Sequence, residues 1–317
     1  MTGPTYQRAA ILGATGPTGF HLAQALLRRG IACRLVARNR EKLAREFRDV
    51  VGEQIIADVA RAEDTARAIA GCDLVVDCIG LGGAEMSGHS VTARNIAAAV
   101  RKSGARCMQV SSYWAYLPAV RIPINERHPR AGGGEWIRQR RAAEDILQEA
   151  GAAILNLPDF FGPRVHTSTL QQALGEAAAG KTMNWIGPAD IVHEFAFVPD
   201  AMAIAAELAL HDEAYGERWI VPGSGPITGR QVAGIAEQVL GRHIAIRPAG
   251  PLMLRLVSLF NRTLRGFMQM VPDYQKPITY DAAKLSALIG KPSVTGYEAA
   301  IGQTLAWIAG TSVTAPR

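Results

Sequence analysis

Short apolar runs and amphipathic helical segments alternate through the first half of this chain. Continuous rather than alternating apolar character is typical of strands that are buried on both faces of a parallel sheet. The alternation predicts an α/β fold with a doubly wound parallel sheet, which is a Rossmann fold. The runs are residues 9–13, 32–37, 53–58, 73–80, 105–112 and 152–158, and the helical patterns are residues 18–29, 40–48, 61–70, 88–103 and 135–150.

The pattern changes in the second half of the chain. Residues 160–190 are rich in Gly, Pro and polar residues, residues 193–210 indicate a short strand and a helix, and residues 218–223 indicate another strand. We therefore predict a Rossmann domain over residues 1–160, with later returns near 191–222. Residues 161–317 would form mainly a smaller, interleaved substrate-binding or lid region.

Composition narrows the class of protein. The 317 residues are 48% hydrophobic, as in ordinary globular domains, and the four cysteines form no C-x-x-C pair. This favours a reducing compartment, the cytoplasm, and argues against a metal site. We expect no nucleic-acid partner, because the net charge of +6 comes from dispersed arginines. An export signal or membrane span would need a long apolar run, and the sequence contains none.

A glycine-rich turn follows the first predicted strand. Gly13, Gly16 and Gly19 are spaced as G-x-x-G-x-x-G at the start of a predicted helix. Such a turn lets the backbone approach a pyrophosphate, and the N–H groups of the helix end meet the anion. Pro17 suits the first turn of that helix because its missing donor is not needed there. We predict a dinucleotide site, to which Thr15 and Thr18 of the same turn and Gly80 after the fourth run also belong.

The end of the second predicted strand indicates which dinucleotide binds. An NAD site usually has Asp or Glu there, whereas an NADP site has Arg for the 2′-phosphate. Arg38 stands in that turn, with no acidic residue before Glu41. We predict NADP rather than NAD. Asp58, after the third run, could accept a hydrogen bond from the adenine amine, although a carboxylate that caps the next helix would look the same.

Several motifs together resemble the short-chain dehydrogenase/reductase superfamily, in its extended and atypical branches that include epimerases and dehydratases. They stand in the family's order over nearly the whole chain: GATGPTG from Gly13, VSSYWAY at 110–116, LPDFFGP at 157–163, HEFAFVPDAMAIAAEL at 193–208 and the segment 219–241. The resemblance implies the Rossmann fold, a nicotinamide cofactor and a small-molecule substrate. Because members of this family often pair through helices, it also allows a homodimer.

In this family a Tyr-x-x-x-Lys pair on the helix after the fifth strand handles the proton. Alignment of that helix places Trp136 at the tyrosine and Arg140 at the lysine. An indole cannot accept a proton, and a guanidinium does not titrate usefully, although Arg140 could still bind the nicotinamide ribose. A literal Tyr-x-x-x-Lys occurs at 280–284, far outside the β-α repeat, and we expect a surface pair on a late helix there.

Other residues of the pocket would then have to replace the missing pair. Ser111 and Ser112 end the fifth strand, and Tyr113 follows at once. We predict Tyr113, Ser112 and Arg140 as catalytic residues, with Tyr113 as the proton donor. Loop packing is the alternative role for each. The candidate substrate contacts are Tyr116, Trp136, His166 and His193.

These residues predict an NADP-dependent oxidoreductase that moves hydride between nicotinamide and a small organic carbonyl, imine or activated alkene. One alternative is a nucleotide-sugar epimerase or dehydratase, and another is a binding protein that senses NADP(H) without turnover. Residues 251–272 combine apolar residues with arginines at helical spacing. We expect a lid or core helix there rather than a helix that contacts a membrane.

Overall fold

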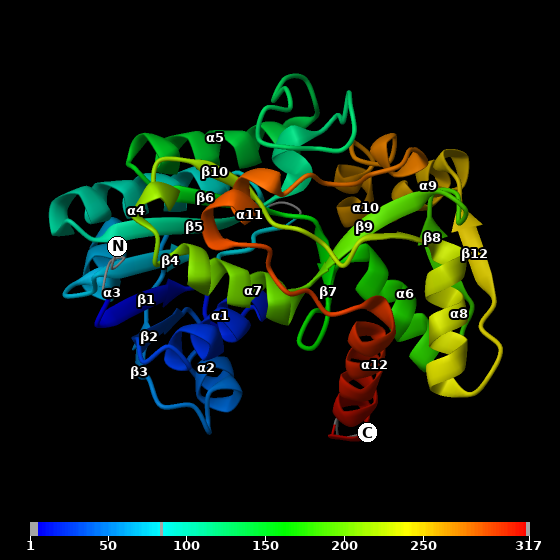
Figure 1. Ribbon diagram of the computed structural model, residues 1–317, viewed down its shortest axis with the longest axis horizontal. Helices are drawn as coiled ribbons and strands as arrows, with labels where there is room; N and C mark the ends of the chain where they lie inside the picture. The colour runs from blue at the N-terminus through cyan, green and yellow to red at the C-terminus, as the bar shows by residue number, and fades with distance from the viewer. Residues whose placement is uncertain (1–5, 83–84, 315–317) are drawn as a thin grey trace.

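A seven-stranded sheet forms the larger part of the molecule. The computed structural model describes residues 6–82 and 85–314 (Figure 1). All neighbouring strands of this sheet are parallel, in the order β10-β6-β5-β4-β1-β2-β3. The predicted fold class is thereby confirmed. The strands are β1 (Arg8–Leu12), β2 (Ala32–Ala37), β3 (Glu53–Ile56), β4 (Leu74–Asp77), β5 (Arg106–Ser112), β6 (Ala153–Leu157) and β10 (Arg218–Ile220).

Helices cover both faces of this sheet, because successive side chains of a buried strand point in opposite directions. In β1, Ile11 packs into one apolar core and Leu12 into another. The first core is closed by α1 (Pro17–Leu27), α2 (Arg40–Glu46), α7 (Val198–Leu208) and α11 (Ala283–Ile289). The second is closed by α3 (Ala62–Ile69), α4 (Gly88–Ser103) and α5 (Glu135–Glu149).

A second region with its own apolar core lies beyond the large sheet (Figure 1). Its three-stranded sheet has the order β11-β9-β7, and a separate parallel pair is formed by β8 and β12. The elements are β7 (Asp159–Phe161), α6 (Thr169–Ala178), β8 (Met183–Ile186), β9 (Val192–Phe197), β11 (Pro226–Thr228), α8 (Gly229–Leu240), β12 (Ile246–Ala249), α9 (Pro251–Ser258), α10 (Arg262–Phe267) and α12 (Tyr297–Thr314). The described residues also form the short 3-10 helices η2 (Tyr113–Tyr116), η3 (Asp212–Ala214) and η4 (Asp273–Gln275).

The chain passes between the two regions more than once. After β9 it returns to the large sheet, where α7 packs against α1 and β10 pairs with β6 at the sheet edge. The segment after η4 then bridges both regions, since Ile278 pairs with His193 and Tyr280 pairs with Ile124. A domain boundary at residue 160 stays a prediction, whereas the structure shows two regions joined by these crossings.

Two expectations about the late part of the chain were wrong. Tyr280 is not on a helix, because α11 begins at Ala283, and its ring packs on Tyr113. Lys284 does lie on α11, where its ammonium contacts Glu217 at 2.8 Å. The stretch 251–272 is not one core helix but the two short helices α9 and α10, with many apolar side chains exposed, and its alternative role as a lid stays a prediction. Within the described parts of the chain, no helix is long and apolar enough to cross a membrane.

Candidate cofactor and active site

The glycine turn after β1 is tightly packed against its neighbours. Gly13 has a φ of +81°, and its N–H donates to the carbonyl of Val36 at 3.0 Å. A Cβ at Gly13 would lie 3.0 Å from the Cys78 carbonyl oxygen, and one at Gly19 only 2.5 Å from the Gly13 oxygen. Side chains at these positions would therefore collide with the backbone. The two glycines thus allow β1, the turn and α1 to pack closely against one another, as the sequence pattern predicts.

The first helix presents an uncapped end to this turn. Gly16 is the residue before α1, no side chain caps the helix, and Pro17 occupies the first position without needing a partner. The Gly16 N–H donates back to the Gly13 carbonyl at 3.0 Å, so the turn is fixed. The N–H groups of Thr18 and Gly19 begin the helix and carry the positive end of its dipole. This end is suited to bind an anionic group.

A cleft of about 530 Å³ lies along the carboxyl ends of β1, β2, β3 and β4. Doubly wound sheets bind their ligands at this edge. The predicted cofactor residues that line the cleft are Gly13, Thr15, Gly16, Arg38, Asp58 and Gly80. Pro17, Thr18 and Gly19 do not line the cleft but form the first turn of α1, where Thr18 is only 8% exposed.

The end of the cleft beside β2 is basic. Arg38 is exposed and Lys42 is half-buried, and both line the cleft. Among the described lining residues the only carboxylates are Asp58 and Glu85. Asp58 uses one carboxylate oxygen, Oδ1, to accept from the N–H of Ala60 at 3.1 Å. The arrangement suits a phosphate near Arg38 better than ribose hydroxyls that need an acceptor.

A buried cation lies near Asp77 but is not among the residues that line this cleft. Arg140 on α5 is 8% exposed, and among the described residues its Nε has no hydrogen-bond partner. Burial lowers the pKa of Arg140, while the nearby carboxylates of Glu144 and Asp77 oppose this shift. Asp77 ends β4, directly before the cleft residues that start at Cys78. A buried donor without a partner costs free energy, so this group fits a ribose hydroxyl or another acceptor.

Glu144 is a buried hub that sequence reasoning missed. The hydroxyl of Ser111 and the amide of Asn156 donate to one oxygen of Glu144, at 2.5 and 2.7 Å. The guanidinium of Arg130 contacts the other oxygen at 2.9 Å. Burial raises the pKa of Glu144, and Arg130 and the hydrogen bond from Ser111 act in the opposite direction. Glu144 thereby links the carboxyl ends of β5 and β6 to α5, and it holds in place the end of β5 where Ser112 lies.

Two tryptophan side chains, Trp114 and Trp136, pack together beside Ser112 and form an apolar wall there. The hydroxyl of Ser112 accepts from the N–H of Trp114 at 3.3 Å, and the ring of Trp114 stacks on Trp136 with centroids 6.4 Å apart. Trp136 also meets α10, since a Cβ at Gly266 would lie 2.0 Å from the indole. Trp136 is therefore part of an apolar wall rather than a lone replacement for a catalytic tyrosine.

Tyr113 points into a buried chain of hydroxyl and carboxyl groups. Its hydroxyl donates to the hydroxyl of Tyr274 at 2.9 Å, and Tyr274 donates to Asp159 at 3.3 Å. Thr169 donates to the same carboxylate. Burial raises the pKa of Tyr113 and of Asp159. The chain connects the carboxyl end of β5 with β7, and only Tyr113 was identified from the sequence.

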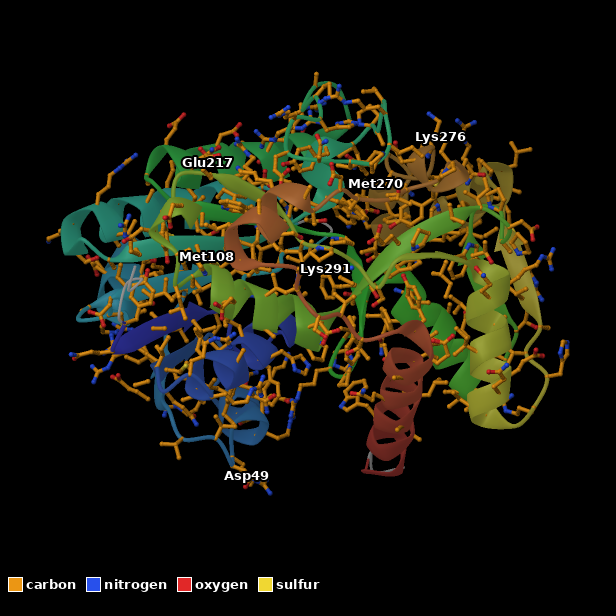
Figure 2. All side chains as sticks on the ribbon, in the orientation of Figure 1. Asp49, Met108, Glu217, Met270, Lys276 and Lys291 are labelled. Carbon is orange, nitrogen blue, oxygen red and sulfur yellow. The ribbon has the colours of Figure 1, made fainter. Side chains whose placement is uncertain are left out.

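The other predicted substrate contacts are dispersed. His193 on β9 stacks on Trp185 and its ring lies 5.7 Å from that of Tyr274, so it borders the Tyr113 chain. Its Nε2 donates to the carbonyl of Lys276, which is labelled in Figure 2. Tyr116 is fully buried, and its hydroxyl donates to Asn156 at 3.4 Å. His166 packs on Trp307, away from this group. The structure thus places Tyr113 near His193. Tyr116 packs in the same buried cluster as Tyr113 but contacts Asn156 instead, and His166 lies apart on Trp307.

Comparisons with known proteins agree with this geometry. Residues 13–154 match the family described as NAD(P)H-binding. Ceramide reductase of Caulobacter vibrioides is 30% identical over 161 residues, 49% of this chain and 46% of that protein, so the alignment spans about half the length of the relative.

Solved structures resemble the whole chain. UDP-glucuronic acid 4-epimerase of Bacillus cereus, in complex with UDP-glucuronic acid and NAD, has a TM-score of 0.80 at 14% identity over 96% of this chain and 99% of that one. dTDP-glucose 4,6-dehydratase of Bacillus anthracis has a TM-score of 0.79 at 13% identity over 97% and 98% of the two chains. Residues 13–154 therefore match an NAD(P)H-binding family, and the chain has the Rossmann-like fold of these epimerase and dehydratase structures.

Proposed function

We propose that this protein is an NADPH-dependent reductase that delivers hydride to the carbonyl group of an apolar substrate. The single observation that carries the choice of NADPH is the basic end of the cleft, where Arg38 and Lys42 lie and no carboxylate ends β2. The glycine turn would hold the pyrophosphate, and Arg140 would donate to the nicotinamide ribose. When bound, the cofactor supplies the hydride.

The chain's own groups favour reduction over alcohol oxidation. Oxidation of an alcohol needs a base, but Trp136 cannot accept a proton, and Arg140 stays charged at neutral pH. Tyr113 keeps its proton because burial raises its pKa. A protonated phenol can still donate to the strongly basic alkoxide that forms as a carbonyl is reduced. In this proposal Tyr113 can therefore donate a proton to the substrate, whereas neither Trp136 nor Arg140 can act as a base.

In this proposal Ser112 orients the carbonyl oxygen and Tyr113 donates the proton to it. Tyr113 is 1% exposed, so Tyr274 must move aside when substrate binds. Tyr274 then returns a proton to Tyr113, and Asp159 lies next in the chain. Hydroxyl groups can reverse the direction of such hydrogen bonds by rotation.

The apolar character of the substrate follows from the wall beside Ser112. Trp114, Trp136 and Phe267 form it, and the ring of Phe267 lies 6.2 Å from that of Trp114. The relative named ceramide reductase supports both a reductive reaction and a substrate with an apolar part.

A nucleotide-sugar epimerase or dehydratase is a second candidate, favoured by the likeness of the whole chain to such structures. The two candidates differ in net redox change. Purified protein should be titrated with NADPH and NADH, then mixed with carbonyl compounds bearing alkyl chains and with UDP-sugars. The reductase consumes NADPH stoichiometrically with alcohol product, whereas an epimerase converts sugars without net consumption. Tight NADPH binding without either reaction would support an NADP(H) sensor instead.

A further inference from the structure

The helical hairpin formed by α9 and α10, residues 251–267, exposes an unusual amount of apolar surface. Phe260 is 93% exposed, Leu252 77% and Leu256 66%. Leu259, Val257 and Met253 add to the same surface. Figure 1 shows the hairpin beside β12, at the end of the molecule remote from β1–β3. Leu252 and Leu256 are one helical turn apart on α9, and Phe260 follows four residues later. Exposed apolar side chains grouped in this way mark an interaction surface.

The hairpin is fixed to the body of the protein by its inner side. Leu254 and Val271 are buried together with Ala249. Met270, labelled in Figure 2, follows α10 and is buried in the core that contains Tyr274. The exposed residues therefore form the outer face of a hairpin whose inner face is packed against the protein.

Hydrogen bonds also hold the tip of the hairpin. The side chain of Asn261 caps α10 by accepting from the N–H of Leu264 at 3.0 Å. The guanidinium of Arg265 donates to the carbonyls of Ser258 and Leu259, at 3.3 and 2.8 Å. Phe260 is thus presented outward on a structured turn.

The charged side chains of the segment that contains the hairpin have one sign. Residues 241–272 contain five arginines, no lysine and no acidic residue. Arg247, Arg255 and Arg262 are exposed, and within the described parts of the chain none of the three has a salt-bridge partner. Apolar side chains bordered by unpaired cations complement an anionic surface that also offers an apolar interior.

We propose that the α9–α10 hairpin docks on the surface of an anionic phospholipid bilayer. Phe260, Leu256 and Leu252 would enter the boundary between headgroups and acyl chains, while Arg255 and Arg262 would contact lipid phosphates. A second copy of the chain fits less well, because a symmetric contact would bring the arginines of both hairpins together. The inference rests on the hairpin alone and does not depend on the cofactor or the reaction.

Vesicle flotation tests this proposal on the full chain. The wild type should float with vesicles of phosphatidylcholine and phosphatidylglycerol, less with pure phosphatidylcholine, and less again as salt rises. Arg255→Gln with Arg262→Gln should weaken binding about thirtyfold, since each basic residue near the surface is worth about fivefold, from roughly 1 kcal/mol. Leu256→Glu with Phe260→Glu should abolish flotation. All four side chains are exposed, so the thermal midpoint should not fall.

Matched control variants lie on the other side of the molecule. Val51 is 90% exposed and lies near Asp49, which Figure 2 places far from Lys276 and Met270. Val51→Glu, and Arg48→Gln with Arg94→Gln, should leave flotation unchanged. The proposal is overturned if the wild type does not float, if the controls weaken binding as much as the hairpin variants, or if Phe260→Glu only dissolves a dimer seen by sedimentation.

Discussion

Gly19 lies directly against the carbonyl group of Gly13, at a distance that excludes any side chain. A Cβ at Gly19 would stand 2.5 Å from the Gly13 oxygen and 2.8 Å from the Ala14 Cα. Both opposing atoms belong to the backbone, so neither can rotate away. The last glycine of the motif is therefore required by packing, and this requirement holds with or without a bound nucleotide.

Gly19→Ala should accordingly destabilise the protein by about 2 kcal/mol, the cost typical of overpacking, and weaken NADPH binding. Gly234→Ala is the matched control. Gly234 lies within α8, and a Cβ there meets nothing within 4 Å, so alanine should be neutral or stabilise by up to ~1 kcal/mol. Urea unfolding of both variants measures the difference. Equal midpoints would mean that the turn is less tightly packed than described.

The basic end of the cleft gives a prediction on cofactor choice. Arg38→Ala should weaken NADPH binding about tenfold or more and leave NADH binding nearly unchanged, because only NADPH carries the 2′-phosphate. Arg40 is equally exposed but does not line the cleft, so Arg40→Ala should have little effect on either. Nicotinamide fluorescence titrations report both constants. An equal loss for the two nucleotides would assign Arg38 to another part of the cofactor.

The buried hub at Glu144 gives a prediction on stability. Glu144→Ala should cost about 3 kcal/mol or more, because Arg130, Ser111 and Asn156 then lose their shared acceptor. Asp145→Asn is the neighbouring control. Asp145 also pairs with Arg130, but its side chain is 48% exposed, so the change should cost no more than ~1 kcal/mol. Chemical denaturation measures the free energy of unfolding of both variants. Similar losses would contradict a central role for Glu144 in this hydrogen-bond network.

His89 gives a prediction on pH dependence. It is 1% exposed, and burial lowers its pKa to about 3, helped by the charge of Arg140. The unfolded chain binds this proton near the ordinary pKa of 6.5, so His89 lowers stability progressively as pH falls from about 6.5 to about 3. His89→Gln should flatten the stability profile in that window relative to the wild type. Parallel profiles for the wild type and His89→Gln would contradict this account.

The Tyr113 chain gives a prediction on turnover. Tyr113→Phe should lower kcat roughly a hundredfold, the usual contribution of a positioned acid, and leave the Kd for NADPH unchanged. Tyr116→Phe is matched in burial and removes a hydroxyl that contacts Asn156 instead. It should reduce stability slightly and retain turnover. Unchanged kcat in Tyr113→Phe would direct the search for the proton donor to Ser112 or water.

Local pattern predicted the large sheet well because its strands and helices are defined by neighbouring residues. The continuous apolar run around β4 and the glycine turn after β1 each carry their signal within a few residues. The Tyr113–Tyr274–Asp159 chain could not be predicted in this way, since its members come from η2, η4 and β7. These residues meet because Tyr274 of η4 contacts both Tyr113 and Asp159, and no short motif in the sequence indicates those contacts.

The same limit applies to Glu144 and to the α9–α10 hairpin. Glu144 looks like an ordinary polar residue of an amphipathic helix, and its burial depends on Arg130 arriving from the preceding loop. Apolar and basic residues at helical spacing in 251–272 are compatible with a core helix or an exposed one. The structure divides the stretch at Asn261, which caps α10, and leaves Leu252, Leu256 and Phe260 exposed.

The central claim is hydride delivery from NADPH to a carbonyl substrate, and isotope transfer tests it most directly. The protein should be incubated with NADPH deuterated at the transferred position and with ketones bearing alkyl chains, and the products analysed by mass spectrometry. The account predicts an alcohol that carries one deuterium at the former carbonyl carbon, in amounts equal to the NADPH consumed. Deuterium retained on the nicotinamide while UDP-sugars are interconverted, or no transfer to any carbonyl despite tight NADPH binding, would contradict it.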